Sequence, residues 1–322
     1  MRGDAVNRRT ITFQAADGYA LTAHVRRHAD RLAMARPVVI INPATSVRCS
    51  YYARFAAFLH QQGFDVITYD YRGIGASRPA SLRGFRASWL DWGRLDFEAA
   101  LQFAVTSFPA QPVQVVAHSV GGFLLGLAPS NPVITRVFSV GAQFAHWRDY
   151  ADRKRLAMLM KWHVAMPLLT RAFGYFPGRR LGWMEDTPSG VVRDWTSRSP
   201  RFEEAWRSGP QALTADERAG LVAQFAAMHA PILALGMTDD EFGTVAAIQR
   251  LLAYFTDSQT THLRLPPESV GDRAVGHFAF FHSRFEMSLW QIALDWLKQG
   301  TLRAELEPFV IPSPQHPKHT SV

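Results

Sequence analysis

The stretch Val115-Val116-Ala117-His118-Ser119-Val120-Gly121-Gly122 decides the fold of this chain. Two β-branched residues lead into a serine and two glycines follow closely, so the pattern predicts a buried strand that turns sharply into a helix. The spacing is that of the nucleophile elbow, G-x-S-x-G, in which the turn holds one serine hydroxyl. Ala117 stands at the first glycine position, so the match is partial, but alanine adds only the smallest Cβ beside the strained serine. The alternative is an ordinary strand-to-helix turn in which Ser119 caps the helix.

Strand and helix patterns alternate on both sides of this stretch. An antiparallel hairpin is predicted over 9–14 and 21–25, with Asp17-Gly18 between its strands. Uninterrupted apolar runs, typical of strands buried on both faces, follow the hairpin and are separated by helical periodicities. Further strands are expected over 37–41, 64–69, 133–140, 231–236 and 260–265, and helices over 51–62, 89–108, 244–255 and 285–297. This alternation predicts an α/β fold with a mostly parallel central sheet flanked by helices, and it places the chemistry beyond the carboxyl ends of the strands.

The pattern changes over residues 141–210, where five of the nine tryptophans lie among many arginines. We interpret this stretch as a helical cap insertion over the strand ends, with an aromatic-lined acyl or aryl pocket. Alternatively, the tryptophans fill the core of a peripheral subdomain. Residues 1–140 and 211–300 then form the core, and residues 301–322, rich in proline and polar groups, form a loosely ordered C-terminal tail.

A serine, an aspartate and a histidine each follow a predicted strand, and together they could form a catalytic triad. A serine hydroxyl is a weak nucleophile until a base removes its proton, and a third group must orient that base. Ser119 follows the elbow strand, Asp239 follows the strand over 231–236, and His277 follows the last strand of the pattern. We expect Ser119, Asp239 and His277 to be the catalytic residues. Asp240 is the alternative acid, and Asp239 is preferred for its spacing from Gly236.

Further motifs lie on both sides of the elbow. Residues 70–77 read Asp-Tyr-Arg-Gly-Ile-Gly-Ala-Ser, residues 236–239 follow the pattern G-x-x-D, and residues 276–278 read Gly-His-Phe. With the elbow, these motifs resemble the D-x-R-G-x-G-x-S, G-x-x-D and G-H-F loops of the α/β-hydrolase superfamily, in its serine hydrolase branch. With Pro43-Ala44-Thr45, the motifs look closest to a poorly characterised bacterial branch of predicted hydrolases. The resemblance covers about 10–298, with the insertion matching only in placement. It implies an α/β-hydrolase fold and a serine hydrolase that needs no cofactor.

The developing oxyanion of such a reaction needs two preorganised N–H donors. One should be the backbone amide of Val120, next to the nucleophile. The resemblance places the other in the loop after the strand over 37–41, where family members often carry His-Gly but this chain has Asn42-Pro43. Because proline has no N–H, Ala44 is the expected donor, with Thr45 as the next choice.

The predicted function is that of a serine hydrolase, carboxylesterase- or lipase-like, which cleaves an ester or related acyl compound through an acyl-enzyme. Three alternatives stay open: an acyltransferase with the same triad, a hydrolase of short peptides or amides, and a non-catalytic ligand-binding homologue. The sequence does not identify the small-molecule acyl substrate.

Other polar residues near the motifs have less specific interpretations. His118 is expected to be a packed elbow residue or pocket wall, and His282 is a second candidate for the base. Asp70 and Arg72 are expected to stabilise a turn. Three arginines of the insertion could receive a substrate carboxylate or simply lie on the surface: Arg148, Arg153 and Arg155.

Composition excludes several other classes of protein. The chain has 322 residues, of which 48% are hydrophobic and 19% charged, as expected of a globular protein with a large core. Its formal charge of +8 comes from scattered arginines, so nucleic-acid binding is not predicted. One cysteine, Cys49, excludes an internal disulfide framework, and no Cys/His cluster has metal-ligand spacing. Neither a membrane span nor a secretory signal is visible, so a cytoplasmic protein is expected, and a homo-oligomer stays open.

Overall fold

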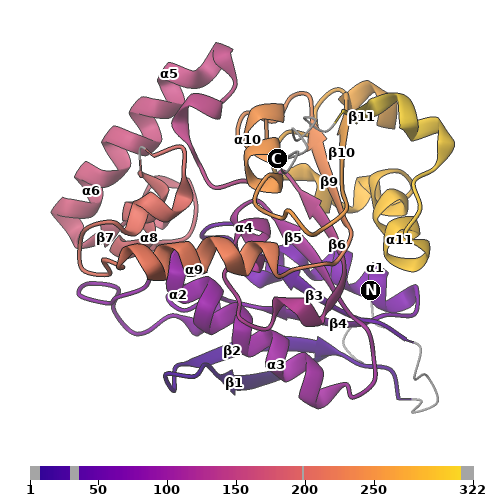
Figure 1. Cartoon of the computed structure of the whole chain (residues 1–322), viewed down its shortest axis with the longest axis horizontal. Helices are drawn as coiled ribbons and strands as arrows, with labels where there is room; N and C mark the ends of the chain where they lie inside the picture. The colour runs from indigo at the N-terminus through magenta and orange to yellow at the C-terminus, as the bar shows by residue number, and fades with distance from the viewer. Residues whose placement is uncertain (1–7, 30–35, 198, 313–322) are drawn as a thin grey trace, which may run out of the picture.

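The computed structural model describes residues 8–29, 36–197 and 199–312, and within them a nine-stranded sheet forms the centre of the molecule (Figure 1). The strands run in the order β1-β2-β4-β3-β5-β6-β9-β10-β11. From β4 to β10 every pairing is parallel, whereas β1–β2, β2–β4 and β10–β11 are antiparallel. The prediction of a mostly parallel sheet is therefore confirmed. The strand bounds are β1 (Arg8–Gln14), β2 (Ala20–Arg26), β3 (Val38–Asn42), β4 (Asp65–Tyr69), β5 (Val113–His118), β6 (Ile134–Val140), β9 (Ile232–Met237), β10 (Thr260–Leu265) and β11 (Val310–Ile311).

Helices cover both faces of this sheet because the central strands are apolar on both sides. In β3, Val38 and Ile40 belong to one buried core, while Val39 and Ile41 belong to the other. The first core packs against α3 (Glu98–Ser107) and α9 (Ala215–Ala226), and the second against α1 (Ala53–Gln61) and α11 (Leu289–Gln299). Burying each large apolar side chain contributes about 1.5–3 kcal/mol, so the two cores together hold the sheet in place.

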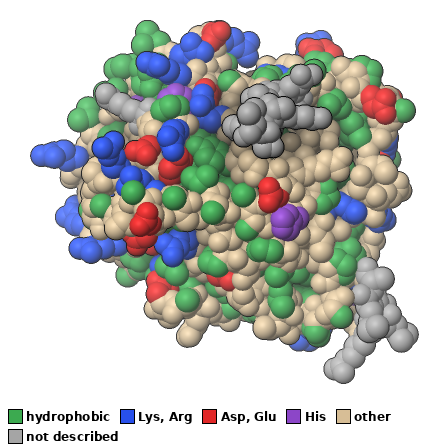
Figure 2. Space-filling model, in the orientation of Figure 1, with side chains coloured by type: hydrophobic (Ala, Val, Ile, Leu, Met, Phe, Trp, Pro, Cys, Tyr) green, Lys and Arg blue, Asp and Glu red, His purple; other side chains and the backbone are tan. Residues whose placement is uncertain are grey.

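Short helices fill the chain between β6 and α9. They are α5 (Arg155–Met158), the π-helical η7 (Leu159–Ala165), α6 (Met166–Phe173), α7 (Gly178–Leu181) and α8 (Ser189–Trp195). A two-stranded sheet of β7 (Tyr175–Phe176) and β8 (Thr187–Pro188) lies among them. Figure 1 shows this helical segment gathered to one side of the main sheet, and in Figure 2 Lys and Arg side chains are numerous over it, with Asp and Glu among them.

The structure differs from the sequence-based expectation at two elements. Helix α9 was not predicted, although Thr214 and Glu217 form a capping box at its start. The chain after Gly300 was expected to be loosely ordered, yet its described part forms the 3-10 helix η12 (Ala304–Phe309) and strand β11, which pairs with β10; residues 313–322 of the predicted tail lie outside the described residues. The N-terminal residues 1–7, on which the absence of a signal was judged, lie outside the described residues.

The remaining predicted elements are present with small shifts at their ends. α2 (Trp89–Asp91), a π-helical turn (Trp92–Phe97) and α3 occupy the helix expected over 89–108, and α4 (Val120–Leu125) and α10 (Val245–Leu252) follow β5 and β9. In the part of the chain that the structure describes, no helix combines the length and the apolar character that a membrane crossing requires.

Candidate active site

Ser119 sits in a strained turn between β5 and α4. Its backbone has φ 55° and ψ −123°, a conformation that costs energy for any residue with a Cβ. The turn is fixed because Ser119 N–H donates to Val140 O (3.0 Å) and because Gly121 packs against β3, where a Cβ would come within 2.4 Å of Asn42 O. The structure therefore has the elbow that the sequence predicted, and Ala117 at its first position is fully buried.

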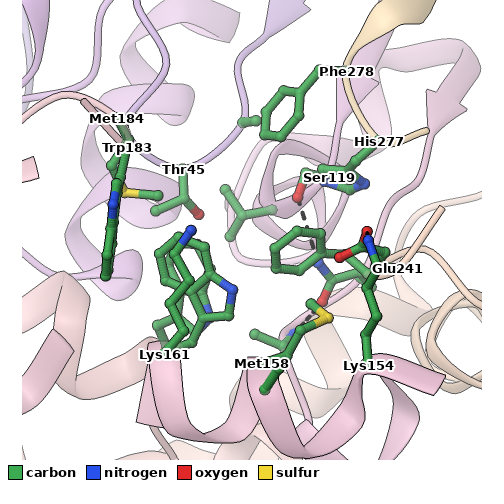
Figure 3. Close-up of a pocket in the computed structure, with 18 of the residues that line it drawn as sticks. Thr45, Ser119, Lys154, Met158, Lys161, Trp183, Met184, Glu241, His277 and Phe278 are labelled. Carbon is green, nitrogen blue, oxygen red and sulfur yellow. Dashed lines mark hydrogen bonds and ion pairs between the residues drawn. The ribbon is translucent and has the colours of Figure 1, made fainter. Parts of the chain in front are cut away.

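His277 lies beside Ser119 and is held by a buried carboxylate (Figure 3). Its Nδ1 donates to Asp240 Oδ2 at 2.7 Å, and Asp240 Oδ1 accepts the backbone N–H groups of Phe242 and Gly243 at 2.8 Å each. Burial opposes ionisation of Asp240, but the charge and hydrogen bond of His277 and the two amides together keep the pKa of this carboxyl below its usual value. Asp240 is therefore a carboxylate, and it fixes the tautomer that leaves Nε2 of His277 free to accept a proton.

Asp239, the acid that we preferred from the sequence, does not contact His277. Its Oδ2 instead accepts the backbone N–H groups of Val275 and Gly276, at 2.9 Å each. Asp239 thus holds the loop that carries the histidine, while the carboxylate beside the imidazole is Asp240, the alternative.

Two glycines allow this close approach of acid and base. A Cβ on Gly141 would lie 2.8 Å from Asp240 Oδ2 and 2.9 Å from His277 Nδ1, and the φ of this residue is +55°. A Cβ on Gly243 would lie 2.5 Å from Asp240 Oδ2. A side chain at either position would therefore push the Asp240 carboxylate away from the His277 imidazole.

Ser119 and His277 open into a cavity of about 320 Å³ whose walls are mainly apolar. The helical segment supplies much of this wall, and the rest comes from Trp89 of α2, from the turn between β5 and α4, and from the loops after β3, β6, β9 and β10. The aromatic and methionine side chains that line the cavity are Trp89, Met158, Trp162, Trp183, Met184, Trp195, Phe242 and Phe278. Such a pocket suits an apolar or aromatic group attached to the reacting carbonyl.

The charges in the cavity wall are distributed unevenly. Lys154 forms an ion pair with Glu241, so these two charges offset one another. Lys161 lies with its ammonium over indole rings instead, and Figure 3 shows it pointing into the cavity. The arginines suggested by the sequence as carboxylate receivers do not line the cavity: Arg148 lies over Trp147 and Arg155 pairs with Asp152.

The backbone amides expected to bind an oxyanion differ in whether they already have an acceptor. Val120 is the first residue of α4, so its N–H has no acceptor within the helix. The Ala44 N–H donates to Tyr52 Oη at 2.9 Å, which withdraws it from a substrate. In the described residues no acceptor pairs with the amide of Thr45, which also lines the cavity, so Thr45 is better placed than Ala44.

Gln143 is a polar residue of this site that the sequence did not point out. It follows β6, and its Nε2 lies 3.5 Å from Ser119 Oγ. The carbonyl of its side chain accepts the Ala145 N–H, which turns the amide nitrogen toward the serine.

His118 connects three loops of the site through buried hydrogen bonds. Tyr52 Oη accepts the Ala44 N–H and donates to His118 Nδ1 at 2.9 Å, while His118 Nε2 donates to His277 O at 2.9 Å. Burial, with a smaller contribution from the nearby His277, lowers the pKa of His118 to about 3. His118 is therefore a neutral structural link rather than a base.

This buried histidine makes stability depend on pH. Below pH 6.5 the unfolded chain protonates His118, whereas the folded chain does not until the pH approaches 3, so acid should lower the free energy of unfolding. One such group contributes at most about 1.4 kcal/mol per pH unit. Urea unfolding between pH 7.5 and 4.5 should show a shallower decline in His118→Gln than in the parent chain, and equal slopes would contradict the neutral assignment.

The remaining residues suggested by the motifs have structural partners. His282 Nε2 lies 3.3 Å from Tyr51 Oη, outside the cavity wall. Asp70 accepts the N–H groups of Cys49 and Ala76. Arg72 forms ion pairs with Asp96 and Asp17, as expected of a group that stabilises a turn.

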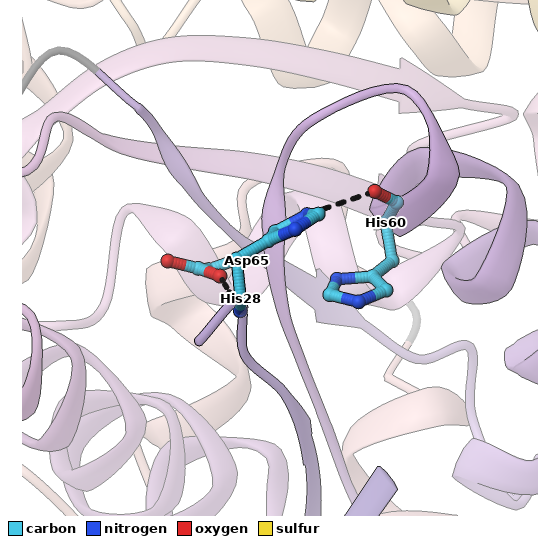
Figure 4. A group of neighbouring side chains, drawn as sticks. All are labelled: His28, His60 and Asp65. Atoms are coloured by element: carbon cyan, nitrogen blue, oxygen red, sulfur yellow. Dashed lines mark hydrogen bonds between the residues drawn. The ribbon is translucent and has the colours of Figure 1, made fainter. Parts of the chain in front are cut away.

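A cluster of metal-ligand side chains lies at the other end of the sheet (Figure 4). Ligand atoms of His28, His60 and Asp65 lie within 4.8 Å of one another, and His60 Nε2 is buried without a partner. However, the two imidazole rings pack against each other, with centroids 3.9 Å apart and planes tilted by 30°. His28 Nε2 already pairs with His60 O, and Asp65 accepts His28 N–H and Gln111 Nε2. This arrangement suits a packed histidine pair.

Comparison with known proteins gives a consistent picture. Residues 33–261 match the family model described as serine aminopeptidase, S33. An esterase from Pyrococcus furiosus superposes with a TM-score of 0.59 at 13% identity over 92% of each chain. Mouse alpha/beta hydrolase domain-containing protein 10 gives 0.54 at 13% identity, over 91% of this chain and 100% of that one. A puromycin-hydrolysing peptidase from Mycobacterium tuberculosis gives 0.52 at 16% identity, over 91% of this chain and 39% of that one. No curated protein matches the sequence. At these identities the structural likeness concerns the fold alone.

Proposed function

Because the chain belongs to the serine aminopeptidase (S33) family and has the α/β-hydrolase fold, we propose that it is a serine hydrolase that cleaves an ester or related acyl compound through an acyl-enzyme. One observation carries this proposal: a strained serine lies beside a histidine whose other nitrogen binds a buried carboxylate, at the wall of an apolar cavity. Strain of this kind persists where the surrounding structure enforces it, as at active sites.

In this proposal each residue of the site has a distinct role. Ser119 Oγ attacks the acyl carbonyl while His277 Nε2 accepts its proton, and the C–O bond to the alcohol breaks as His277 returns the proton to the leaving oxygen. Water then attacks the acyl-serine by the same route, which releases the acid and restores the serine. Asp240 stabilises the imidazolium, and the amides of Val120 and Thr45 donate to the oxyanion.

The helical segment between β6 and α9 serves in this proposal as a cap. Met158, Trp162, Trp183 and Trp195 of this segment line the cavity, so its helices would surround the acyl or aryl group and limit the access of water. In this proposal the cap keeps the sequence-based bounds of 141–210, and α9, whose Phe225 packs on Phe123 of α4, belongs to the hydrolase core.

Peptide or amide hydrolysis is the second candidate, favoured by the description of the family model. An aminopeptidase must bind a free α-ammonium group, which calls for an unpaired carboxylate in the pocket. The cavity lining contains one carboxylate among the described residues, that of Glu241, and it is paired with Lys154. Lys161 adds a positive charge to the lining. The charge in the described cavity therefore favours esters over substrates with a free amine.

A paired substrate assay tests this proposal. The protein should hydrolyse p-nitrophenyl butyrate and react with a fluorophosphonate probe, and leucine p-nitroanilide should be a much poorer substrate. Faster cleavage of the anilide would support the peptidase, and transfer of the acyl group to an added alcohol or amine would indicate an acyltransferase. A protein that neither reacts with the probe nor cleaves either substrate would contradict the proposal.

A further inference from the structure

One cation in the cavity wall has no counter-ion in the described structure. Lys161 Nζ lies 4.5 Å from the ring centroid of Trp162 and 4.2 Å from that of Trp183, and no carboxylate of the described residues lies within ion-pair distance of it. The nearest acidic residue of the wall, Glu241, is bound to Lys154. Lys161 comes from η7, a π-helical turn, and such turns are frequent at functional sites.

Lys161 is half-buried, and a cation that is partly withdrawn from water against apolar groups is unfavourable unless something stabilises its charge. The two indole faces supply part of this stabilisation, since a cation–π contact is worth about 0.5–2 kcal/mol. Burial lowers the pKa of Lys161, and the charge of Glu241 opposes this only in part, so the charged form is stabilised less here than in water. An anion delivered by the substrate would complete the compensation.

We propose that Lys161 binds a carboxylate carried by the substrate, at the end of the cavity wall formed by the tryptophans and away from Ser119. This inference rests on the proposed function and names its substrate class: acyl compounds in which an apolar or aromatic spacer joins the reacting carbonyl to a free carboxylate. A single ammonium suits a monoanion, whereas a phosphate dianion is usually bound by several donors or by arginine. The apolar lining between Lys161 and the serine suits the spacer.

The test compares matched substrates that differ only in this charge. The probes are mono-p-nitrophenyl esters of linear dicarboxylic acids with six to ten carbons, each beside the analogue in which the free carboxylate is capped as a methyl ester. The parent protein should prefer the free acid at one chain length. Lys161→Met should lower kcat/KM for that substrate by roughly 10- to 100-fold, the range expected for a charged hydrogen bond. The loss should lie mainly in KM, because the carboxylate is remote from the reacting bond.

Variants separate recognition of the anion from packing. Lys161→Arg keeps the cation and should retain part of the preference, while Lys298→Met removes an exposed lysine of α11 and should change neither substrate. Equal losses for the free acid and its capped analogue in Lys161→Met would show that Lys161 only packs against the tryptophans. A preference that persists in this variant would place the anion elsewhere. Both results overturn the inference while leaving the ester hydrolase intact, whereas a parent protein that cleaves neither substrate contradicts the proposed function itself.

Discussion

Ser119→Ala is expected to lower kcat/KM for a p-nitrophenyl ester by at least about 10⁴-fold, because no other group can take the place of the nucleophile. Alanine has the same Cβ as serine, so the elbow at φ 55° should keep its conformation. Within the described residues the hydroxyl has one hydrogen bond, a weak one to Gln143 Nε2 at 3.5 Å, so its loss should change stability little. Steady-state kinetics and thermal unfolding of the purified variant measure both effects.

A second serine provides the matched control. Ser139 in β6 is buried, and its Oγ has no hydrogen-bond partner within the described structure. Ser139→Ala removes the same atoms one strand away and should leave kcat/KM unchanged. If Ser119→Ala retains the parent rate, or if the two variants lose activity equally, Ser119 is not the nucleophile.

Asp240→Asn is expected to lower kcat by roughly 10³- to 10⁴-fold while leaving KM nearly unchanged. The amide of asparagine would donate to His277 Nδ1 and so favour the wrong tautomer, and it would also remove the charge that stabilises the imidazolium. The backbone amides of Phe242 and Gly243 can still bind the side-chain oxygen, so the loop should stay folded.

The neighbouring carboxylate gives a control for this prediction. Asp239→Asn retains an oxygen that can accept the N–H groups of Val275 and Gly276, so we expect a loss of less than about tenfold, with a modest fall in stability. The ratio of the two losses assigns the acid. A larger loss in Asp239→Asn than in Asp240→Asn would return that role to Asp239, and circular dichroism would exclude unfolding as the cause.

The sheet could be predicted from sequence because its strands are apolar on both faces. All residues of β3, β5 and β9 are buried, and each strand is a mostly apolar stretch of sequence between turn residues. Helix α9 was not predicted because its apolar face is narrow: Leu221 and Phe225 are its buried residues. The capping box of Thr214 and Glu217 could have indicated where the helix begins. Strand β11 has only two residues, which is too short for a periodic pattern.

The sequence indicates the loops that carry the candidate site residues, but it does not show which of their side chains contact one another. Asp239 and Asp240 are adjacent, and the turn after β9, in which Asp240 N–H donates to Met237 O, decides which carboxylate faces the histidine. Likewise, the Ala44 N–H donates to the hydroxyl of Tyr52, a residue of another element, and so is not available to an oxyanion. A local sequence pattern does not reveal such contacts, because they depend on how separate loops pack together.

The charge in the cavity depends on the same kind of packing. The sequence offered Arg148, Arg153 and Arg155 as carboxylate receivers, but the helical segment turns Lys161 into the cavity instead. A π-helical turn shifts the helix face by part of a turn, so a periodicity of 3.6 residues does not show which side chain points inward.

The central claim, that Ser119 forms a covalent acyl intermediate, is tested most directly by mass spectrometry after rapid acid quenching. The protein is mixed with p-nitrophenyl acetate, quenched within milliseconds and digested. The account predicts a burst of p-nitrophenol and an added acetyl group on the peptide that contains Ser119, which disappears in Ser119→Ala. Turnover with no acetyl group on Ser119, or with the acetyl group on another residue, would contradict it.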